Sequence, residues 1–172
     1  MSTRAIYRFY DDHNHHAVYK HYDGYPSAAA EFLFKALTFA WPLPRYEADD
    51  MAAAFVAANK HSGGGDVRLL NMSQSGDKFD MGQEYEYEIF PAKNGQLIVR
   101  AWYGDYQEGE VYFYGRLKDF CLKELINYDP DGIVKAFHGE IDDPVKTKDV
   151  AISDAIRDLI SQMNDILEKV EK

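Results

Sequence analysis

Acidic and apolar side chains alternate one by one between residues 83 and 90, and this alternation restricts the fold more than any other feature of the sequence. Successive side chains of a β-strand point to opposite faces of a sheet, so a strand here separates the two kinds of residue. The acidic set is Glu84, Glu86 and Glu88, and the apolar set is Tyr85, Tyr87 and Ile89. The sequence therefore predicts a strand with one solvated acidic face and one apolar face.

Two further strands are predicted directly after this one. The Asn94-Gly95 pair is typical of a tight hairpin turn. Residues 97–103 then form the partner strand, and residues 110–115 form a third strand after a glycine-bounded turn. Because the connections are short, the three strands should make an antiparallel meander.

The N-terminal part of the chain predicts a hairpin followed by two helices. Residues 4–10 alternate as a strand, and residues 17–22 return as a second strand after a polar turn. Apolar residues recur at helical spacing over residues 28–40, and a second helix is expected from residue 47 to about residue 60. A strand over residues 67–72 then leads into an exposed loop.

The C-terminal part predicts a short helix over residues 117–128, a largely irregular stretch over 129–148 and a long helix over 149–172. The long helix carries apolar residues at steps of four and three, the spacing of an a/d seam. The seam consists of Ile152, Ile156, Leu159, Met163, Ile166 and Val170. Such a helix either docks on the body of the protein or associates with a copy of itself, and both alternatives stay open.

These elements predict a single α+β domain over residues 1–172, which is an ordinary size for one domain. Its antiparallel sheet would combine the N-terminal hairpin and the central meander, with two helices packed on one face. The helix over residues 149–172 would complete the domain and could mediate a homodimer.

Charge and cysteine content limit the partners and the compartment. A formal net charge of -10 repels a phosphate backbone, so direct binding of nucleic acid is not expected. The single cysteine, Cys121, cannot form an intramolecular disulfide, and its apolar neighbours indicate a buried side chain. The sequence has neither an apolar leader nor an apolar stretch of about 18 residues. We therefore expect a cytoplasmic protein that does not enter a membrane.

Three histidines beside the first turn, His13, His15 and His16, are weak candidates for metal ligands. The neighbouring Asp11 and Asp12 would supply carboxylates to the same region. Side chains in a turn splay into water, so the simpler interpretation is a solvated turn with a chance run of histidines. No cofactor is expected.

The segment over residues 21–26 is a second candidate site, because a strand that leads into a helix N-terminus places polar side chains beside free backbone N–H groups. His21, Asp23 and Tyr25 would bind an anion or small ligand there. In the structural alternative Asp23 caps the helix, Tyr25 packs and Pro26 begins the helix.

The N-terminal half also resembles a known group of proteins. The resemblance is carried by residues 4–6, the motif His21-Tyr22-Asp23-Gly24-Tyr25-Pro26, residues 52–57, the glycine run at 63–67 and the tyrosine-acid alternation at 84–88. In these motifs the chain is similar to a family of small uncharacterised bacterial and phage proteins. The resemblance implies a phage, prophage or accessory-genome setting and brings no established activity with it.

The row formed by Glu84, Glu86 and Glu88 is the last candidate, as an acidic interaction face. Three like charges on one face could imitate a phosphate track and attract a basic protein partner. The alternative is an ordinary solvated sheet face, partly neutralised by Lys93 or Arg100 on the neighbouring strand.

Two classes of function remain. The favoured hypothesis is a non-enzymatic binding protein that self-associates and acts on a host protein or a small ligand, because no catalytic constellation stands out in the sequence. The alternative is a metal-assisted or acid-base enzyme centred on His21 and Asp23.

Overall fold

The computed structural model describes residues 2–60, 66–73, 77–104, 108–125 and 129–137. Their elements follow in the order β1 (Ala5–Tyr10), β2 (His15–Lys20), α1 (Pro26–Leu37), α2 (Ala48–Asn59), β3 (Val67–Leu70), β4 (Tyr85–Pro91), β5 (Leu97–Tyr103), β6 (Glu110–Arg116), α3 (Leu117–Glu124) and α4 (Pro130–Ala136). All belong to the first of two compact units, Met1–Ile141. The second unit, Asp142–Lys172, lies outside the described residues together with the predicted seam helix, so the single-domain organisation stays a prediction.

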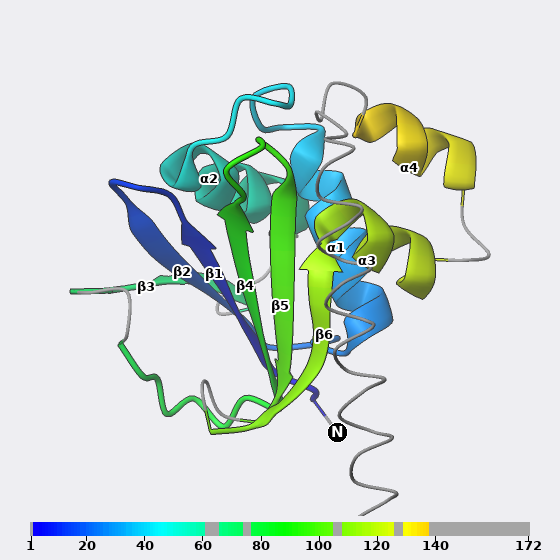
Figure 1. Cartoon of the computed structure of the whole chain (residues 1–172). Helices are drawn as coiled ribbons and strands as arrows, with labels where there is room; N and C mark the ends of the chain where they lie inside the picture. Colours follow the sequence, from blue (N-terminus) through cyan, green and yellow to red (C-terminus); the bar gives the residue numbers. More distant parts are fainter. Residues whose placement is uncertain (1, 61–65, 74–76, 105–107, 126–128, 138–172) are drawn as a thin grey trace, which may run out of the picture. The chain divides into compact units, whose positions relative to one another are not determined.

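The strands form one mixed sheet in the order β3-β2-β1-β4-β5-β6 (Figure 1). The predicted hairpin is confirmed, since β1 and β2 pair antiparallel, and so is the predicted meander of β4, β5 and β6. The expectation of an entirely antiparallel sheet is wrong at one place, because β1 and β4 pair in parallel. The α+β class is therefore confirmed, with a sheet that is mostly antiparallel.

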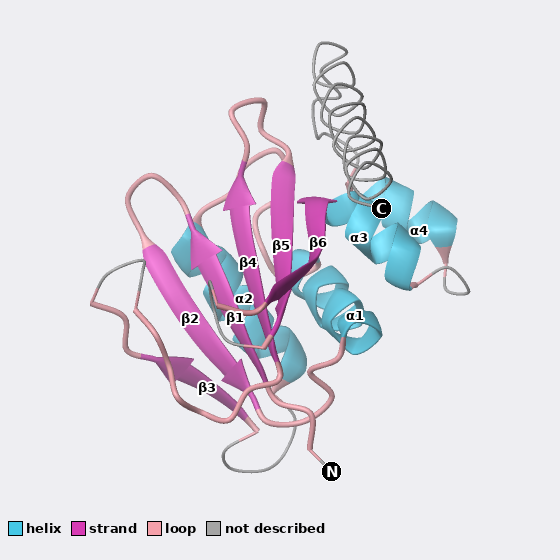
Figure 2. Cartoon of the chain, turned by 60° about the horizontal axis from the view of Figure 1, so that its bottom comes forward, coloured by secondary structure: helices cyan, strands magenta, loops and turns pink. Residues whose placement is uncertain are grey.

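Three helices, α1, α2 and α3, cover one face of this sheet (Figure 2). Small side chains on α1, such as Ala29 and Ala36, are fully buried and let the helix lie close to its neighbours. The ring of Tyr7 lies at the centre of this layer, with its centroid 5.1 Å from that of Tyr87 and 4.3 Å from that of Phe55. The main core thus joins the two central strands to α2.

In the described part of the chain the opposite face is covered over β1, β2 and the part of β4 around Glu86, which is 0% exposed. Ile6, Ala17 and Tyr19 are buried there beneath a group of partly buried side chains from the last residue of β3 and the loop that follows it. That group comprises Leu70, Met72, Phe79 and Met81. Over β5 and β6 the same face is open, since Val111 is 45% exposed and Tyr114 is 54% exposed.

The bounds of β2 and the stretch after α3 differ from the sequence-based expectation in ways that matter for the candidate sites and the fold. Strand β2 begins at His15 and ends at Lys20, so His15 and His16 belong to the strand and His21 lies beyond it. Helix α4, Pro130–Ala136, forms within the stretch expected to be irregular, and the Asp129 side chain accepts a hydrogen bond from the Gly132 N–H at its start. The glycine run at residues 63–65 lies outside the described residues. None of the helices in the described ranges is long and apolar enough to cross a membrane.

Candidate functional site

The turn before α1 is a rigid structural joint. Gly24 donates a hydrogen bond from its N–H to the Thr3 carbonyl over 2.8 Å, and its own carbonyl accepts one from the Tyr87 hydroxyl over 2.8 Å. A Cβ atom at Gly24 would lie 2.7 Å from the Ala5 Cβ, so only glycine fits this close approach. The preceding residue, Asp23, adopts a left-handed conformation with φ of 58°.

The candidate ligands in this turn have different surroundings. His21 shares a 2.7 Å hydrogen bond between its Nδ1 atom and the Tyr19 hydroxyl, and its ring lies edge-on to that of Tyr22. Asp23 is exposed. The interpretation of Asp23 as the helix cap is wrong, because Tyr25 occupies the N-cap position without a side-chain hydrogen bond. Pro26 begins the helix as predicted.

Asp11, one of the carboxylates beside the histidines, has a clear structural role. Its Oδ1 atom accepts hydrogen bonds from the N–H groups of His13 and Asn14, and its Oδ2 atom accepts one from the N–H of Ala48 over 2.8 Å. Ala48 is the first residue of α2, so Asp11 caps a helix that begins 37 residues later. Among the described residues, which include His13, His15 and His16, no group of three or more His, Cys, Asp or Glu side chains could hold a metal ion.

The glutamate row does not form the expected acidic surface. Glu84 is exposed, but Glu86 is 0% exposed and Glu88 is 5% exposed. The prediction of a solvated row is therefore wrong for two of its three members. The reason is tertiary: the neighbouring strands bring Arg8 to Glu86 and Arg100 to Glu88.

Arg8 and Glu86 form the centre of a buried polar network. The Nη1 atom of Arg8 donates to the Asp77 carbonyl over 2.7 Å, and the amide of Gln83 donates to Glu86 over 2.8 Å. Burial lowers the pKa of Arg8, but the charge and hydrogen bond of Glu86 outweigh it and raise the pKa overall. The network ties the loop that covers β1 and β2 to the sheet beneath it.

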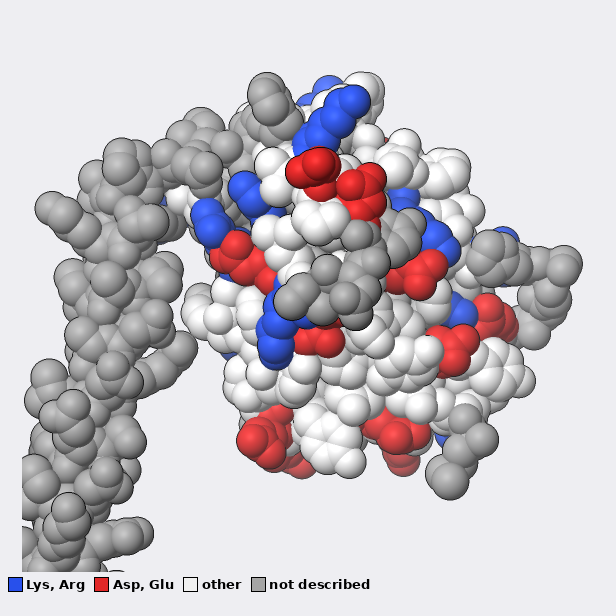
Figure 3. Space-filling model, turned by 90° about the vertical axis from the view of Figure 1, so that its right-hand side faces the viewer, with Lys and Arg blue, Asp and Glu red and all other residues white. Residues whose placement is uncertain are grey.

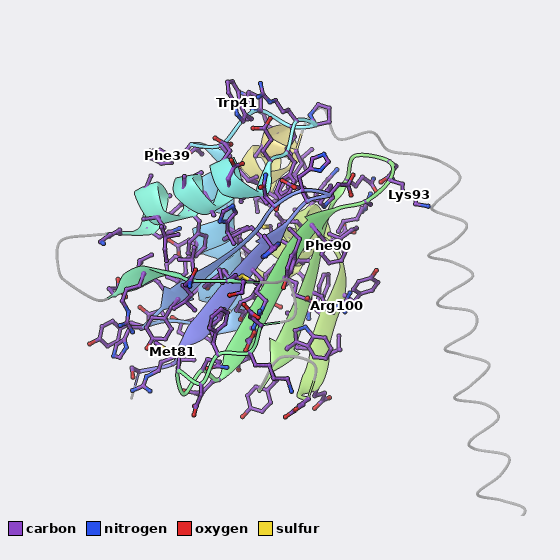
Figure 4. All side chains as sticks on the ribbon, turned by 90° about the vertical axis from the view of Figure 1, so that its left-hand side faces the viewer. Phe39, Trp41, Met81, Phe90, Lys93 and Arg100 are labelled. Carbon is purple, nitrogen blue, oxygen red and sulfur yellow. The ribbon has the colours of Figure 1, made fainter. Side chains whose placement is uncertain are left out.

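The open half of the sheet carries a surface that the sequence did not single out. We call it the arginine-aromatic surface, and it consists of Phe90 on β4, Ile98, Arg100 and Trp102 on β5, and Val111 and Tyr114 on β6. Strand register places these residues on one face, since Glu88 pairs with Arg100 and Arg100 pairs with Tyr114. Phe90 and Arg100 lie together on the sheet face that Figure 4 turns to the viewer.

Arg100 lies at the centre of this surface. Its guanidinium carbon is 5.7 Å from the ring centroid of Phe90, 5.8 Å from that of Trp102 and 5.4 Å from that of Tyr114. The Nε atom lies 3.3 Å from Oε2 of Glu88, and the same oxygen accepts a 3.2 Å hydrogen bond from the Trp102 indole. The predicted neutralisation by Arg100 is thus confirmed at Glu88.

The arrangement leaves the outer end of Arg100 available. Its side chain is 36% exposed, and within the described part of the chain Glu88 is its only ion-pair or hydrogen-bond partner. A guanidinium has five N–H donors, and among the described residues neither terminal nitrogen of Arg100 donates a hydrogen bond, so both keep their donors for a ligand. The rings of Phe90, Trp102 and Tyr114 lie close enough to the guanidinium for cation–π contact.

A signal for this surface is present in the sequence. On β5 the residues Ile98, Arg100 and Trp102 alternate with the buried Leu97, Val99 and Ala101. An arginine between an aliphatic and an aromatic residue on the outward face of a strand is an unusual choice for a plain solvated surface. The neighbouring strands β4 and β6 supply the other two rings, Phe90 and Tyr114, and the sequence of β5 alone does not identify these neighbours.

The remaining charges do not gather into an acidic track on the face shown in Figure 3. Among the described residues of that face, Lys and Arg side chains lie between Asp and Glu side chains.

Comparison of the chain with protein-family models, with curated proteins and with solved structures found no match.

Proposed function

We propose that the chain is a non-enzymatic binding protein that captures a segment of a protein partner on the arginine-aromatic surface. The observation that carries the proposal is the placement of Arg100 among three aromatic rings on an open sheet face. Tryptophan, tyrosine and arginine are the residues that contribute most to protein interfaces. Isolated exposed apolar residues are ordinary, whereas a contiguous group on one face indicates an interaction site.

Preorganisation supports the same conclusion. Binding costs free energy when flexible side chains become ordered, and Arg100 would normally contribute much of that cost. Here Glu88 forms an ion pair with Arg100, and the Trp102 indole donates a hydrogen bond to Glu88. The side chain is therefore already arranged before a partner arrives, so its contacts contribute to affinity with little loss of freedom.

The other expectations from the sequence remain proposals. An accessory role in a bacterium or phage rests on the resemblance in the N-terminal half. Self-association rests on the seam helix, which lies outside the described residues. For the alternative enzyme, the Tyr19 hydroxyl already shares a hydrogen bond with one ring nitrogen of His21, and no contact among the described residues specifically favours catalysis there.

The proposal is tested with a random peptide library displayed against the purified protein. We expect peptides that share a common sequence motif to be enriched. These peptides should bind the variants Val111→Asp and Tyr114→Asp at least tenfold more weakly than they bind the wild type. A tenfold loss corresponds to about 1.4 kcal/mol, which is modest for a central interface residue.

Leu69→Asp is the matched control, because Leu69 is 66% exposed on β3 at the other end of the sheet. It introduces the same charge on a similar exposed strand and should leave peptide affinity unchanged. The proposal is wrong if no peptide is enriched, or if the enriched peptides bind the Val111 and Tyr114 variants as tightly as the wild type.

A further inference from the structure

We propose that Arg100 recognises the carboxylate of an Asp or Glu side chain within an extended partner segment that lies across β4, β5 and β6. This inference rests on the proposed function and names the chemistry that the surface selects. The apolar neighbours of that acidic residue would pack on the rings of Tyr114 and Phe90 and on Val111.

The first argument is the geometry of the guanidinium. Its Nε atom lies 3.3 Å from Oε2 of Glu88, and among the described residues the two terminal nitrogens donate no hydrogen bond, so they form a planar fork with free donors. A carboxylate accepts two parallel hydrogen bonds from such a fork, whereas an amide or hydroxyl matches it with one oxygen. The free donors therefore favour a carboxylate over a neutral polar group.

The second argument is the local medium. Arg100 is flanked by Phe90, Trp102 and Tyr114, and Trp102 is almost fully buried. A bound segment would complete this apolar enclosure and lower the effective dielectric constant around the ion pair. Charge-assisted hydrogen bonds strengthen in such surroundings.

The third argument limits the number of charges on the partner. The protein has a net charge of -10, and Glu88 already places one negative charge beside Arg100. Each negative charge on the partner meets both repulsions, so a polyanion is repelled more strongly than a single carboxylate, which gains the arginine fork and the ring contacts at the smallest electrostatic cost. An open sheet face also suits a side chain in mid-segment, since chain-terminal carboxylates are typically captured in nests of backbone N–H groups.

The test uses two peptides that differ in one functional group, acetyl-Leu-Glu-Leu-amide and acetyl-Leu-Gln-Leu-amide. Binding is followed by NMR at the indole N–H of Trp102, which donates to Glu88 and so reports on changes at Arg100. The variant Trp41→Phe identifies which of the two indole signals is that of Trp102. We expect the glutamate peptide to bind about tenfold more tightly than the glutamine peptide, a charge-assisted difference.

Two variants at Arg100 then locate the preference. Arg100→Gln should abolish it, and Arg100→Lys, which keeps a positive charge beside Glu88, should reduce it several-fold because a lysine lacks the fork. Arg45→Gln is the control, since Arg45 also lies over an indole ring, that of Trp41, at 3.8 Å. It should leave the preference unchanged.

A third peptide, acetyl-Leu-Leu with a free C-terminal carboxylate, distinguishes a side-chain carboxylate from a chain terminus. The inference is overturned if the Glu and Gln peptides bind wild-type protein equally, if neither shifts the Trp102 signal, if Arg100→Gln keeps the preference, or if the terminal carboxylate binds better than the side chain. Library peptides that require Val111 and Tyr114 but carry no acidic residue would leave the proposed function standing and remove this inference alone.

Discussion

The Nε atom of Arg8 on β1 donates a 2.7 Å hydrogen bond to Oε2 of Glu86 on β4, across the one parallel pair of strands in the described sheet. The side chains of Arg8 and Glu86 are 0% and 1% exposed. Such a pair contributes little net stability relative to an apolar pair, but removal of one member leaves the other charge buried without compensation.

We therefore predict that Arg8→Met lowers the free energy of unfolding by about 3–5 kcal/mol, as for other broken buried ion pairs. The double variant Arg8→Met/Glu86→Leu should lose much less than the sum of the two single variants. Urea denaturation of all four proteins measures this coupling. Simple additivity of the two single losses would contradict it.

Asp11 should stabilise the fold through its cap on α2. We predict that Asp11→Ala lowers the free energy of unfolding by about 1 kcal/mol, the usual cost of a lost N-cap. Asp12→Ala is the control, because Asp12 is the exposed neighbour of Asp11 in the same turn. Equal losses from the two variants would argue against the cap.

The contribution of Asp11 should also depend on pH. Burial raises the pKa of Asp11, but the N–H donors of Ala48, His13 and Asn14 outweigh it and hold the pKa below its usual value of 3.8. A carboxyl whose pKa is lower in the folded state stabilises fully above the unfolded-state pKa, and the effect is lost as the pH falls through the folded-state pKa. The difference in stability between wild type and Asp11→Ala should therefore shrink in acid, which unfolding curves between neutral and strongly acidic pH will show.

Two stacked tyrosines provide a matched pair of substitutions. Among the described residues, the buried hydroxyl of Tyr7 has no hydrogen-bond partner, whereas the hydroxyl of Tyr87 donates to Gly24. Tyr7→Phe should be neutral or stabilise by up to about 1 kcal/mol, while Tyr87→Phe should cost about 1–3 kcal/mol because it leaves the Gly24 carbonyl unpaired. Thermal and urea unfolding measure the stability of both variants. A larger loss of stability for Tyr7→Phe than for Tyr87→Phe would contradict the assignment of the hydrogen bond to Tyr87.

The joint before α1 provides a second contrast. Gly24→Ala should destabilise by about 1–3 kcal/mol, the cost of overpacking, because the new Cβ would meet the backbone of Arg4 and Ala5 at 2.8 and 2.9 Å. Asp23→Gly should be tolerated, since glycine adopts the positive φ of position 23 without strain. A tolerated Gly24→Ala, measured by urea unfolding, would show that the strand and turn can separate.

Local patterns were sufficient for the hairpin, the meander and the two helices after the hairpin. Each of these depends on residues that are close in sequence, such as the Asn94-Gly95 turn between β4 and β5. Helix α4 was missed because seven residues are too few for a clear periodicity. Its start does carry a helix signal, since Asp129 caps the helix and Pro130 occupies its first turn.

The candidate site depended on information that one strand does not contain. Alternation showed that Glu86 and Glu88 share a face, but only their neighbours decide whether that face meets water. Arg8 comes from a strand nearly eighty residues earlier, and Arg100 comes from the strand that follows. The pairing of β4 with β5 places Arg100 beside Glu88, and the pairing of β5 with β6 adds Tyr114 to the surface around Arg100.

The parallel pairing of β1 with β4 has a consequence for how the protein is made. Its partners, such as Tyr7 and Tyr87, are separated by 80 positions, so the N-terminal hairpin leaves the ribosome long before its central neighbour exists. Long-range contacts of this kind slow folding, and unpaired strand edges in the meantime are prone to aggregation. During synthesis the β1 edge of the nascent hairpin therefore stays unpaired until translation has passed residue 91, the end of β4.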